Sequence, residues 1–497
     1  MVSRLLVRRA MRGASAWPIV VLLASCAVGP DYVRPIADTP SAFKESEGWK
    51  PAEPRAIDPH QPWWTWYGDP VLDGLVAQVD GANQTLRQAE AQYRAARAAV
   101  DIARAGYWPQ VGANASVQRG VSSTQPNAVG TSLSVGLTAS WEPDLWGGVR
   151  RAVEAGQAAA EASGDDLAAA RLSIQSALAQ DYFQLRYIDV ARSLYVQTIA
   201  DYARALDLTR AQYAQGVVLR SDVALAETQL TSTQAAAADL DAQRAAFEHA
   251  IAILIGKPPA SFALPPAEPV DAFGARLPAV PLALPSELLE RRPDIAAAER
   301  RAAAANAEIG VAQAAYFPQL SLSASGAGVA STLARLLETP TRFWSLGAVL
   351  AQTVFDGGLR SARSAQAVAT YDANVAAYRQ TVLTAFQQIE DDLATLRVLD
   401  QETALQDAAV RSAQVAERLA LAQYRGGTAT YLAVVTAQTL SLSNQRTAVQ
   451  LHSRQLATSV GLIAALGGGW QAGTPVAGAA SAPVAERGRL LTSATEP

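Results

Sequence analysis

The chain repeats itself once along its length. Three landmarks recur in the same order about 210 residues apart, a period too long for a solenoid and typical of a duplicated fold. Each half is therefore expected to contain the same elements. The landmarks are Tyr107-Trp108-Pro109-Gln110 and Tyr316-Phe317-Pro318-Gln319, Gly147-Gly148-Val149-Arg150 and Gly357-Gly358-Leu359-Arg360, and Ala211-Gln212-Tyr213 with Gly216 and Ala422-Gln423-Tyr424 with Gly427.

Each half begins with a helix that a proline ends, and strands follow. The patterns predict helices over 84–107 and 294–316, which stop because Pro109 and Pro318 cannot continue a helix. Apolar residues then alternate with polar residues or glycine over 111–117, 133–141, 320–324 and 344–350. This period of two predicts four strands with one apolar and one wet face. The polar segments Ser122–Gly130 and Ser331–Thr341 are expected to be loops.

A very long helix is expected after each glycine pair. From Ile174 to Tyr213 mostly apolar residues recur at alternating steps of four and three, which is a heptad seam. A helix over 150–213 would be about 100 Å long. A turn at Gly216 is expected to reverse the chain, with Ser221 as the N-cap of a helix that runs from Asp222 to about Ile255. In the second half the same pattern covers 359–424, a turn at 426–427 and a return to about 466.

The N-terminus carries a targeting segment. Four arginines precede a short apolar run over 14–24, which predicts a signal peptide over 1–25. Small residues directly before Cys26 are typical of a lipoprotein cleavage site, so Cys26 is expected to become an acylated N-terminus, with 26–61 as a lipid-anchored segment. Ordinary signal cleavage that leaves a free cysteine is the alternative. One cysteine excludes an internal disulfide and a cysteine-based zinc site.

The strands decide how the chain assembles. No run of 18 apolar residues follows the signal, so a membrane role would require strands or the lipid. A sheet in lipid must close on itself, and four strands are too few for a barrel. Three copies would supply about twelve strands and leave a lumen. A soluble strand pair on a coiled-coil protein is the alternative, but it explains neither the duplication nor the lipid.

Several further motifs occur along the chain. They are Cys26 with Gly29-Pro30-Asp31-Tyr32, Pro62-Trp63-Trp64 with Gly68-Asp69-Pro70 and Leu72, Leu284-Pro285-Ser286-Glu287-Leu288-Leu289-Glu290-Arg291-Arg292-Pro293-Asp294-Ile295, and, in support, Tyr316-Phe317-Pro318-Gln319 and Phe355-Asp356-Gly357-Gly358. In these motifs the chain resembles the TolC-like outer membrane efflux factors, in particular their lipoprotein branch, the NodT family. The resemblance implies a mainly α mixed fold, with a homotrimer that forms a twelve-stranded transmembrane β-barrel and an α-helical periplasmic tunnel. It also implies a periplasmic adaptor and an inner-membrane RND pump as partners, and efflux of small molecules. The repeats are then expected at 62–275 and 276–470, and composition predicts a disordered tail over 471–497.

The same resemblance implies that the two helix–helix turns of each subunit, one in each half, form the periplasmic tip, which closes the tunnel and contacts the adaptor. These turns also need glycine simply to reverse the chain. The second turn lacks the acidic residue that family members often carry there, because residues 428–430 are neutral, so no acidic ring is expected. The expected tip residues are Gly216, Val217, Arg220, Ser221, Asp222, Gly426, Gly427, Thr428 and Tyr431.

Enzymatic chemistry has little support. His60, His249 and His452 are far apart, no HExxH pattern occurs, and the acidic run 390–392 fits a solvated helix face. No catalytic residue, metal ligand or cofactor is therefore expected. A net charge of −4 gives no indication of nucleic-acid binding. A channel for type I protein secretion or metal-ion export remains as the alternative function, since the pump chooses the cargo.

Overall fold

The computed structural model describes residues 27–45, 62–122, 125–266, 278, 291–336, 338 and 341–470. The chain divides into two compact units, and each takes segments from both halves of the sequence. The first unit contains the residues up to Ala37, Gln92–Ser163 and Ala297–Gln380. The second contains Asp38–Ala91, Gly164–Ala296 and the residues from Thr381 onward. The expected signal peptide and C-terminal tail lie outside the described residues.

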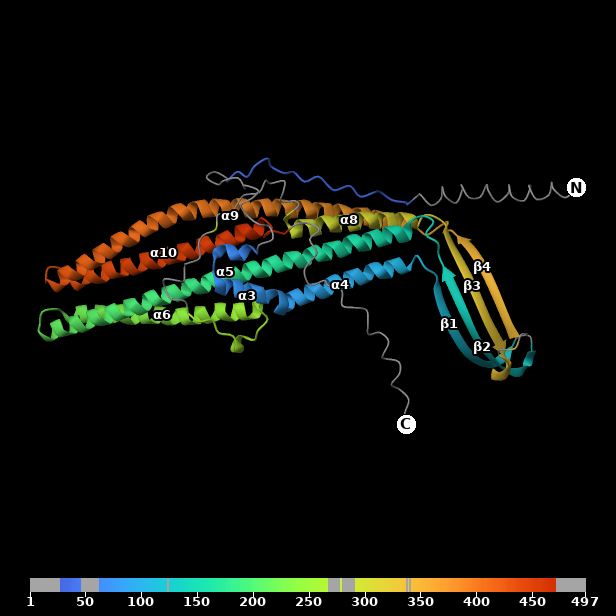
Figure 1. The fold of residues 1–497 in the computed structure, drawn as a ribbon, viewed down its shortest axis with the longest axis horizontal. Coiled ribbons are helices and arrows are strands. Elements are labelled where there is room, and N and C mark those ends of the chain that lie inside the picture. Colours follow the sequence, from blue (N-terminus) through green and yellow to red (C-terminus); the bar gives the residue numbers. More distant parts are fainter. Residues whose placement is uncertain are drawn as a thin grey trace, which may run out of the picture. The chain divides into compact units, whose positions relative to one another are not determined.

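The first unit is built on an antiparallel sheet (Figure 1). Its strands are β1 (Gln110–Ser122), β2 (Gln125–Trp141), β3 (Gln319–Ala330) and β4 (Arg342–Ala351). They pair in the order β1-β2-β3-β4, so the two halves of the duplication meet where β2 pairs with β3. The loop expected over Ser122–Gly130 is wrong, because β1 ends at Ser122 and β2 already begins at Gln125. Hydrogen bonds between the two backbones let the strands extend through polar residues, because these positions do not have to fill a core.

The register gives the sheet two different faces. Val117 pairs with Leu133, and Leu137 with Ala113 and Gly326, so one face is apolar. The opposite face carries serine pairs that are bonded through their hydroxyls: Ser116 with Ser134, and Ser325 with Ser345, each at 2.8 Å. The described strands thus confirm the predicted alternation. β1 and β4 each pair on one side only in this sheet, so their outer edges are open.

Helices enter and leave the sheet at one end. α4 (Gln84–Ala105) leads to β1, and α8 (Pro293–Ala314) leads to β3. α5 (Gly148–Ala214) follows β2, and α9 (Leu359–Arg425) follows β4. Both of these long helices have 67 residues, and both begin within the first unit and continue into the second.

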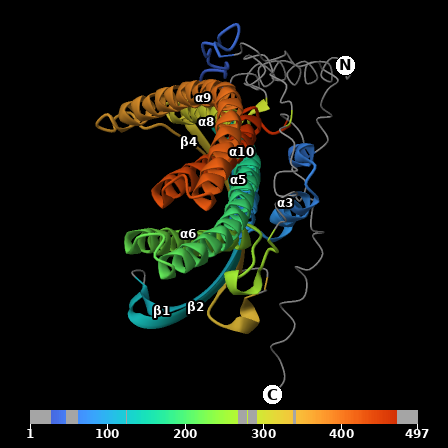
Figure 2. The same cartoon turned by 90° about the vertical axis from the view of Figure 1, so that its left-hand side faces the viewer.

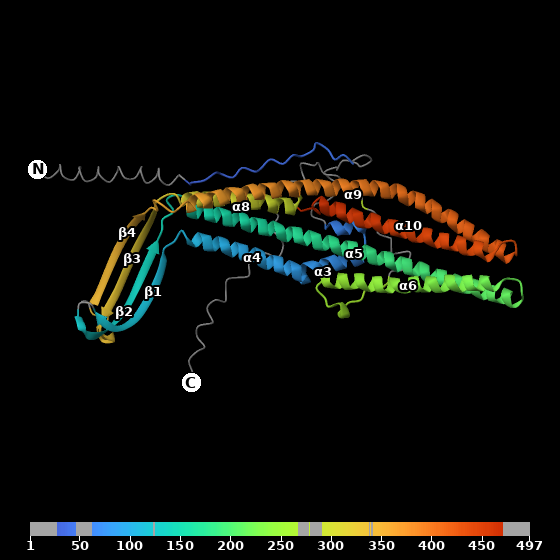
Figure 3. The same ribbon diagram turned by 180° about the vertical axis from the view of Figure 1, so that it is seen from behind.

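The second unit contains two long antiparallel helix pairs. α6 (Arg220–Leu254) returns along α5, and α10 (Tyr431–Ala465) returns along α9 (Figures 2 and 3). Ion pairs join the facing sides of α5 and α6. Arg210 contacts Glu227 at 2.7 Å, and Arg192 contacts Asp241 at 2.9 Å. The long helices and their glycine turns are therefore placed as the sequence predicted. Short elements complete the unit: η1 (Trp63–Tyr67), α3 (Pro70–Ala82) and η2 (Pro259–Ser261).

The heptad seam of α5 forms the core of this unit. Leu178, Leu185, Ile188 and Tyr195 are buried, as a packed seam requires. Arg192, by contrast, is exposed, because it turns outward to its ion pair.

Candidate functional site

The two helix–helix turns have the same backbone geometry. Gly216 ends the α5 side with φ 72°, and Gly427 ends the α9 side with φ 74°. In the first turn the N–H of Val217 donates to the carbonyl of Gln212, and the N–H of Gly216 donates to that of Tyr213. In the second turn the donors are the N–H groups of Thr428 and Gly427, and the acceptors are the carbonyls of Gln423 and Tyr424. Both are Schellman motifs, which require positive φ at the glycine.

The start of α6 differs from the prediction. Leu219, not Ser221, is the N-cap, and Ser221 is an exposed residue of the first turn of the helix. The carboxylate of Asp222 accepts the backbone N–H of Leu219 at 3.2 Å and so closes the helix end. Arg220 is exposed. The turn also exposes apolar side chains, since Val217 and Leu219 are 67% and 71% accessible.

Tyr431 lies in the core of the tip instead of on its surface. It is 2% exposed and meets Tyr424 edge to face, with ring centroids 5.3 Å apart. Burial raises the pKa of Tyr431 to about 12, so the phenol stays neutral. The surrounding apolar cluster takes residues from all four long helices, including Leu206, Ala226 and Val434. This cluster holds the two helix pairs together near their turns.

A polar tie between α5 and α9 was not predicted. The hydroxyl of Tyr424 donates to the Gln212 side chain at 2.6 Å and lies 3.3 Å from the hydroxyl of Thr209. The repeat pattern singled out Tyr424 and its counterpart Tyr213, but Tyr213 is 46% exposed. Because the repeat aligns both tyrosines equally, the sequence could not tell which of them crosses between the pairs.

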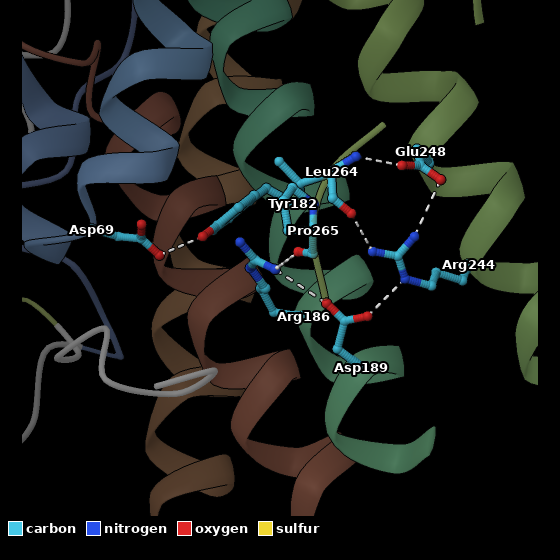
Figure 4. Close-up of polar contacts among 8 residues, drawn as sticks. All are labelled: Asp69, Tyr182, Arg186, Asp189, Arg244, Glu248, Leu264 and Pro265. Carbon is cyan, nitrogen blue, oxygen red and sulfur yellow. Dashed lines mark hydrogen bonds and ion pairs between the residues drawn. The ribbon is translucent and has the colours of Figure 1, made fainter. Parts of the chain in front are cut away.

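A second polar network fixes the far end of the α5–α6 pair (Figure 4). Asp189 is buried, and its carboxylate forms ion pairs with Arg186 at 3.1 Å and with Arg244 at 2.7 Å. These arginines donate to the carbonyls of Pro265 and Leu264, while Glu248 pairs with Arg244 and accepts the N–H of Leu264. The segment after α6 is therefore bound to both helices. Because removal of one partner leaves a buried charge without compensation, the two arginines and Asp189 stabilise the fold only when all three are present.

The first described residues lie beside the sheet. The N–H of Val28 donates to the carbonyl of Trp146, between β2 and α5. Arg151 on α5 contacts the carbonyls of Val28 and Gly29 and the carboxylate of Asp31. A Cβ at Gly147 would lie 2.9 Å from the Cα of Ala27, so this close approach favours glycine. Cys26 itself lies outside the described residues.

Two negative findings apply to the described residues only. No group of three or more potential metal-ligating side chains occurs among them. None of their helices is long and apolar enough to cross a membrane.

A sheet with one apolar and one hydroxyl-lined face, continued by long paired helices, has the construction of a channel wall. Comparison with known proteins agrees. The chain matches the Outer membrane efflux protein family over residues 75–257 and 284–468. It therefore belongs to this family, and it is an outer-membrane channel of Gram-negative efflux pumps and not an enzyme. Proteins of this kind are components of tripartite efflux systems.

Individual relatives span most of the chain. The pyoverdine export outer membrane protein OpmQ of Pseudomonas aeruginosa is 34% identical over 420 residues, which cover 82% of this chain and 87% of OpmQ. Outer membrane protein OprJ of the same species is 32% identical over 94% of this chain and 98% of its own length. The solved structure of the outer-membrane channel OprN superposes with a TM-score of 0.82 at 31% identity, covering 90% of this chain and 100% of that one.

Proposed function

We propose that three copies of this chain form one exit duct, which receives small molecules from an inner-membrane RND pump through a periplasmic adaptor. The open edges of β1 and β4 support the trimer. An unpaired edge cannot face lipid, so β4 of one copy must pair with β1 of the next. Three sheets then give about twelve strands, with the serine-lined face toward the lumen.

We assign adaptor docking to the tip turns. The observation that carries this assignment is the exposure of Val217 and Leu219 beside Arg220. Exposed apolar side chains that are grouped, and not single, are typical of protein interaction sites. Gly216, Ser221, Asp222, Gly426, Gly427 and Thr428 shape the two turns, and Tyr431 supports them from within.

We also assign closure of the duct to the tip. The tie from Tyr424 to Gln212 and Thr209 holds α9 against α5 within one chain. Opening requires the helix pairs to separate, so this contact is expected to favour the closed state. Closure by a neutral, buried contact fits a second turn without an acidic residue.

Cys26 is proposed to carry the lipid. Its support is positional, because Val28, two residues later, is bonded next to the end of β2. In the proposed orientation, an acyl chain on Cys26 would enter the membrane beside the barrel, where it adds to the anchoring that the strands provide.

The cargo is proposed to be small molecules instead of a secreted protein. The relative OpmQ is named for export of pyoverdine, and a 27% identical relative, CusC of Escherichia coli, is named for cation efflux. The two relatives are named for different cargoes, so we expect the pump to determine the particular substrate.

Docking is tested by placing a charge on the exposed tip. Leu219→Glu should abolish co-purification of the adaptor and lower pump-dependent drug resistance at least tenfold, while the amount of trimer in the membrane stays the same. Leu405→Glu is the matched control, because Leu405 is 73% exposed on α9 well before the turn, and it should change neither. Normal adaptor binding by Leu219→Glu would contradict the assignment.

A further inference from the structure

The apolar face of the sheet contains a groove. On this face β3 presents Gly326 and Gly328, whereas neighbouring strands present larger residues such as Leu137 and Trp344. A groove of about 370 Å³ lies over the two glycines, and Val135, Leu137, Leu336 and Arg342 are among the residues that line it. A second hollow of about 340 Å³ continues along β3 beside Ala324, Leu322 and Trp141.

The hairpin end of the groove is covered by the chain itself. The connection from β3 to β4, which includes η4 (Leu333–Arg335), folds back so that Leu336 is buried against β3. A Cβ at Gly328 would overlap the carbonyl oxygen of Leu336, so the close approach depends on this glycine. The groove is thus closed at one end and open along the strand.

Positive charge gathers at the same end. Among the described strand residues of the apolar face, the charged ones are Arg119 and Arg342, and both lie in the half nearest the hairpins. Arg342 pairs in register with Gly328, directly at the groove, and it is exposed. Arg335 lies in the connection between β3 and β4, together with Glu338. Arginine on a lipid-facing strand is tolerated near the interface, where it meets head groups.

We propose that this groove binds a phosphorylated, multiply acylated glycolipid of the outer leaflet, with one acyl chain over Gly326 and Gly328 and a phosphate beside Arg342. The inference rests on the proposed orientation, in which the apolar face meets lipid and the hairpins point outward. From Gly328 to Leu322 the strand rises about 20 Å, enough for one extended acyl chain. Arginine pairs well with phosphate because its planar fork can donate two hydrogen bonds.

Binding is tested on the purified full-length protein, stripped of lipid and titrated with bisphosphorylated lipid A. The comparison ligands are the same lipid without phosphates and phosphatidylglycerol, and native mass spectrometry counts the bound molecules. Gly326→Leu fills the groove without a clash, because no atom lies within 4 Å of a Cβ at this position. It should weaken lipid A binding at least tenfold. Arg342→Gln should reduce binding of the phosphorylated lipid to the level of the phosphate-free lipid.

Ala348→Leu is the control, because it also places a leucine on the apolar face, on β4 outside the residues that line either hollow, and it should bind like wild type. Unchanged lipid A binding by Gly326→Leu would overturn the inference, and so would equal affinity for phosphatidylglycerol. Conductance in planar bilayers separates the two proposals. A wild-type protein that binds lipid A but forms no pore would refute the duct, whereas a pore without lipid selectivity would refute only the groove.

Discussion

At the residue scale, two glycines determine whether the tip can form. Gly216 and Gly427 have positive φ, and no atom lies within 4 Å of a Cβ at either position, so a side chain would cost backbone strain and not steric overlap. Gly216→Val or Gly427→Val should each cost about 1–3 kcal/mol locally. Because the sheet is a separate unit, trimer levels should stay near normal while pump-dependent resistance falls.

The neighbouring glycine supplies the control for this prediction. Gly426 has no positive φ, and the nearest atoms to its Cβ position are at ordinary distances of 3.5 and 3.6 Å. Gly426→Ala should therefore keep the shape of the second turn and leave resistance unchanged. If all three variants behave like wild type in resistance assays, the tip turns are only chain reversals.

A single hydroxyl tests the proposed closure. Tyr424→Phe removes the hydrogen bonds to Gln212 and Thr209 but keeps the ring against Tyr431. The loss should be about 0.5–1.5 kcal/mol, enough to raise the resting conductance of the channel several-fold. Tyr213→Phe, at the equivalent exposed position of the first repeat, should not alter conductance. Equal conductance of Tyr424→Phe and wild type would rule out this contact as part of the closure.

At the scale of elements, α9 carries a carboxylate that is poorly solvated. Asp392 faces a cavity of about 570 Å³, which is also lined by Arg292, Asp294 and Gly461. Burial and, secondarily, Asp391 raise its pKa to about 6. The folded state therefore binds this proton more tightly than the unfolded chain does. The free energy of unfolding should fall as pH rises from about 4 to about 6, and then remain lower.

Asp392→Asn should remove this penalty. At pH 7 it should stabilise the helical unit by about 1 kcal/mol, a value reduced for partial exposure, and at pH 4 it should have no effect. Thermal melts followed by circular dichroism at both pH values measure the difference. Asp391→Asn removes only the secondary, electrostatic cause of the raised pKa, so at pH 7 it should stabilise the unit less than Asp392→Asn does. A stabilisation by Asp392→Asn that is the same at both pH values would contradict the pKa argument.

The sequence predicts elements better than the contacts between them. Prolines, glycines and apolar periods placed the long helices and the strands, because each of these signals acts within a few residues. Ser221 misled the prediction because the Asp222 carboxylate accepts the N–H of Leu219, so the helix cap lies two residues earlier than predicted. The tie from Tyr424 to Gln212 joins residues 212 positions apart. No local period shows which faces of two distant helices will meet.

At the scale of the whole molecule, the duplication explains why one chain supplies two hairpins and two helix pairs. The sheet joins both halves through β2 and β3 and leaves one open edge from each half. Open edges, a serine-lined face and the predicted signal peptide before Cys26 lead to the central proposal, which is that the working protein is an acylated trimer. None of these features depends on which substrate the pump delivers.

Native mass spectrometry of the detergent-purified protein from outer membranes tests this claim most directly. The account predicts one dominant species whose mass equals three chains that each begin at Cys26 and carry acyl groups. Dissociation in the gas phase should release single chains with the lipid on the N-terminal residue. A folded single chain as the dominant species, or chains that begin elsewhere and carry no lipid, would contradict the account.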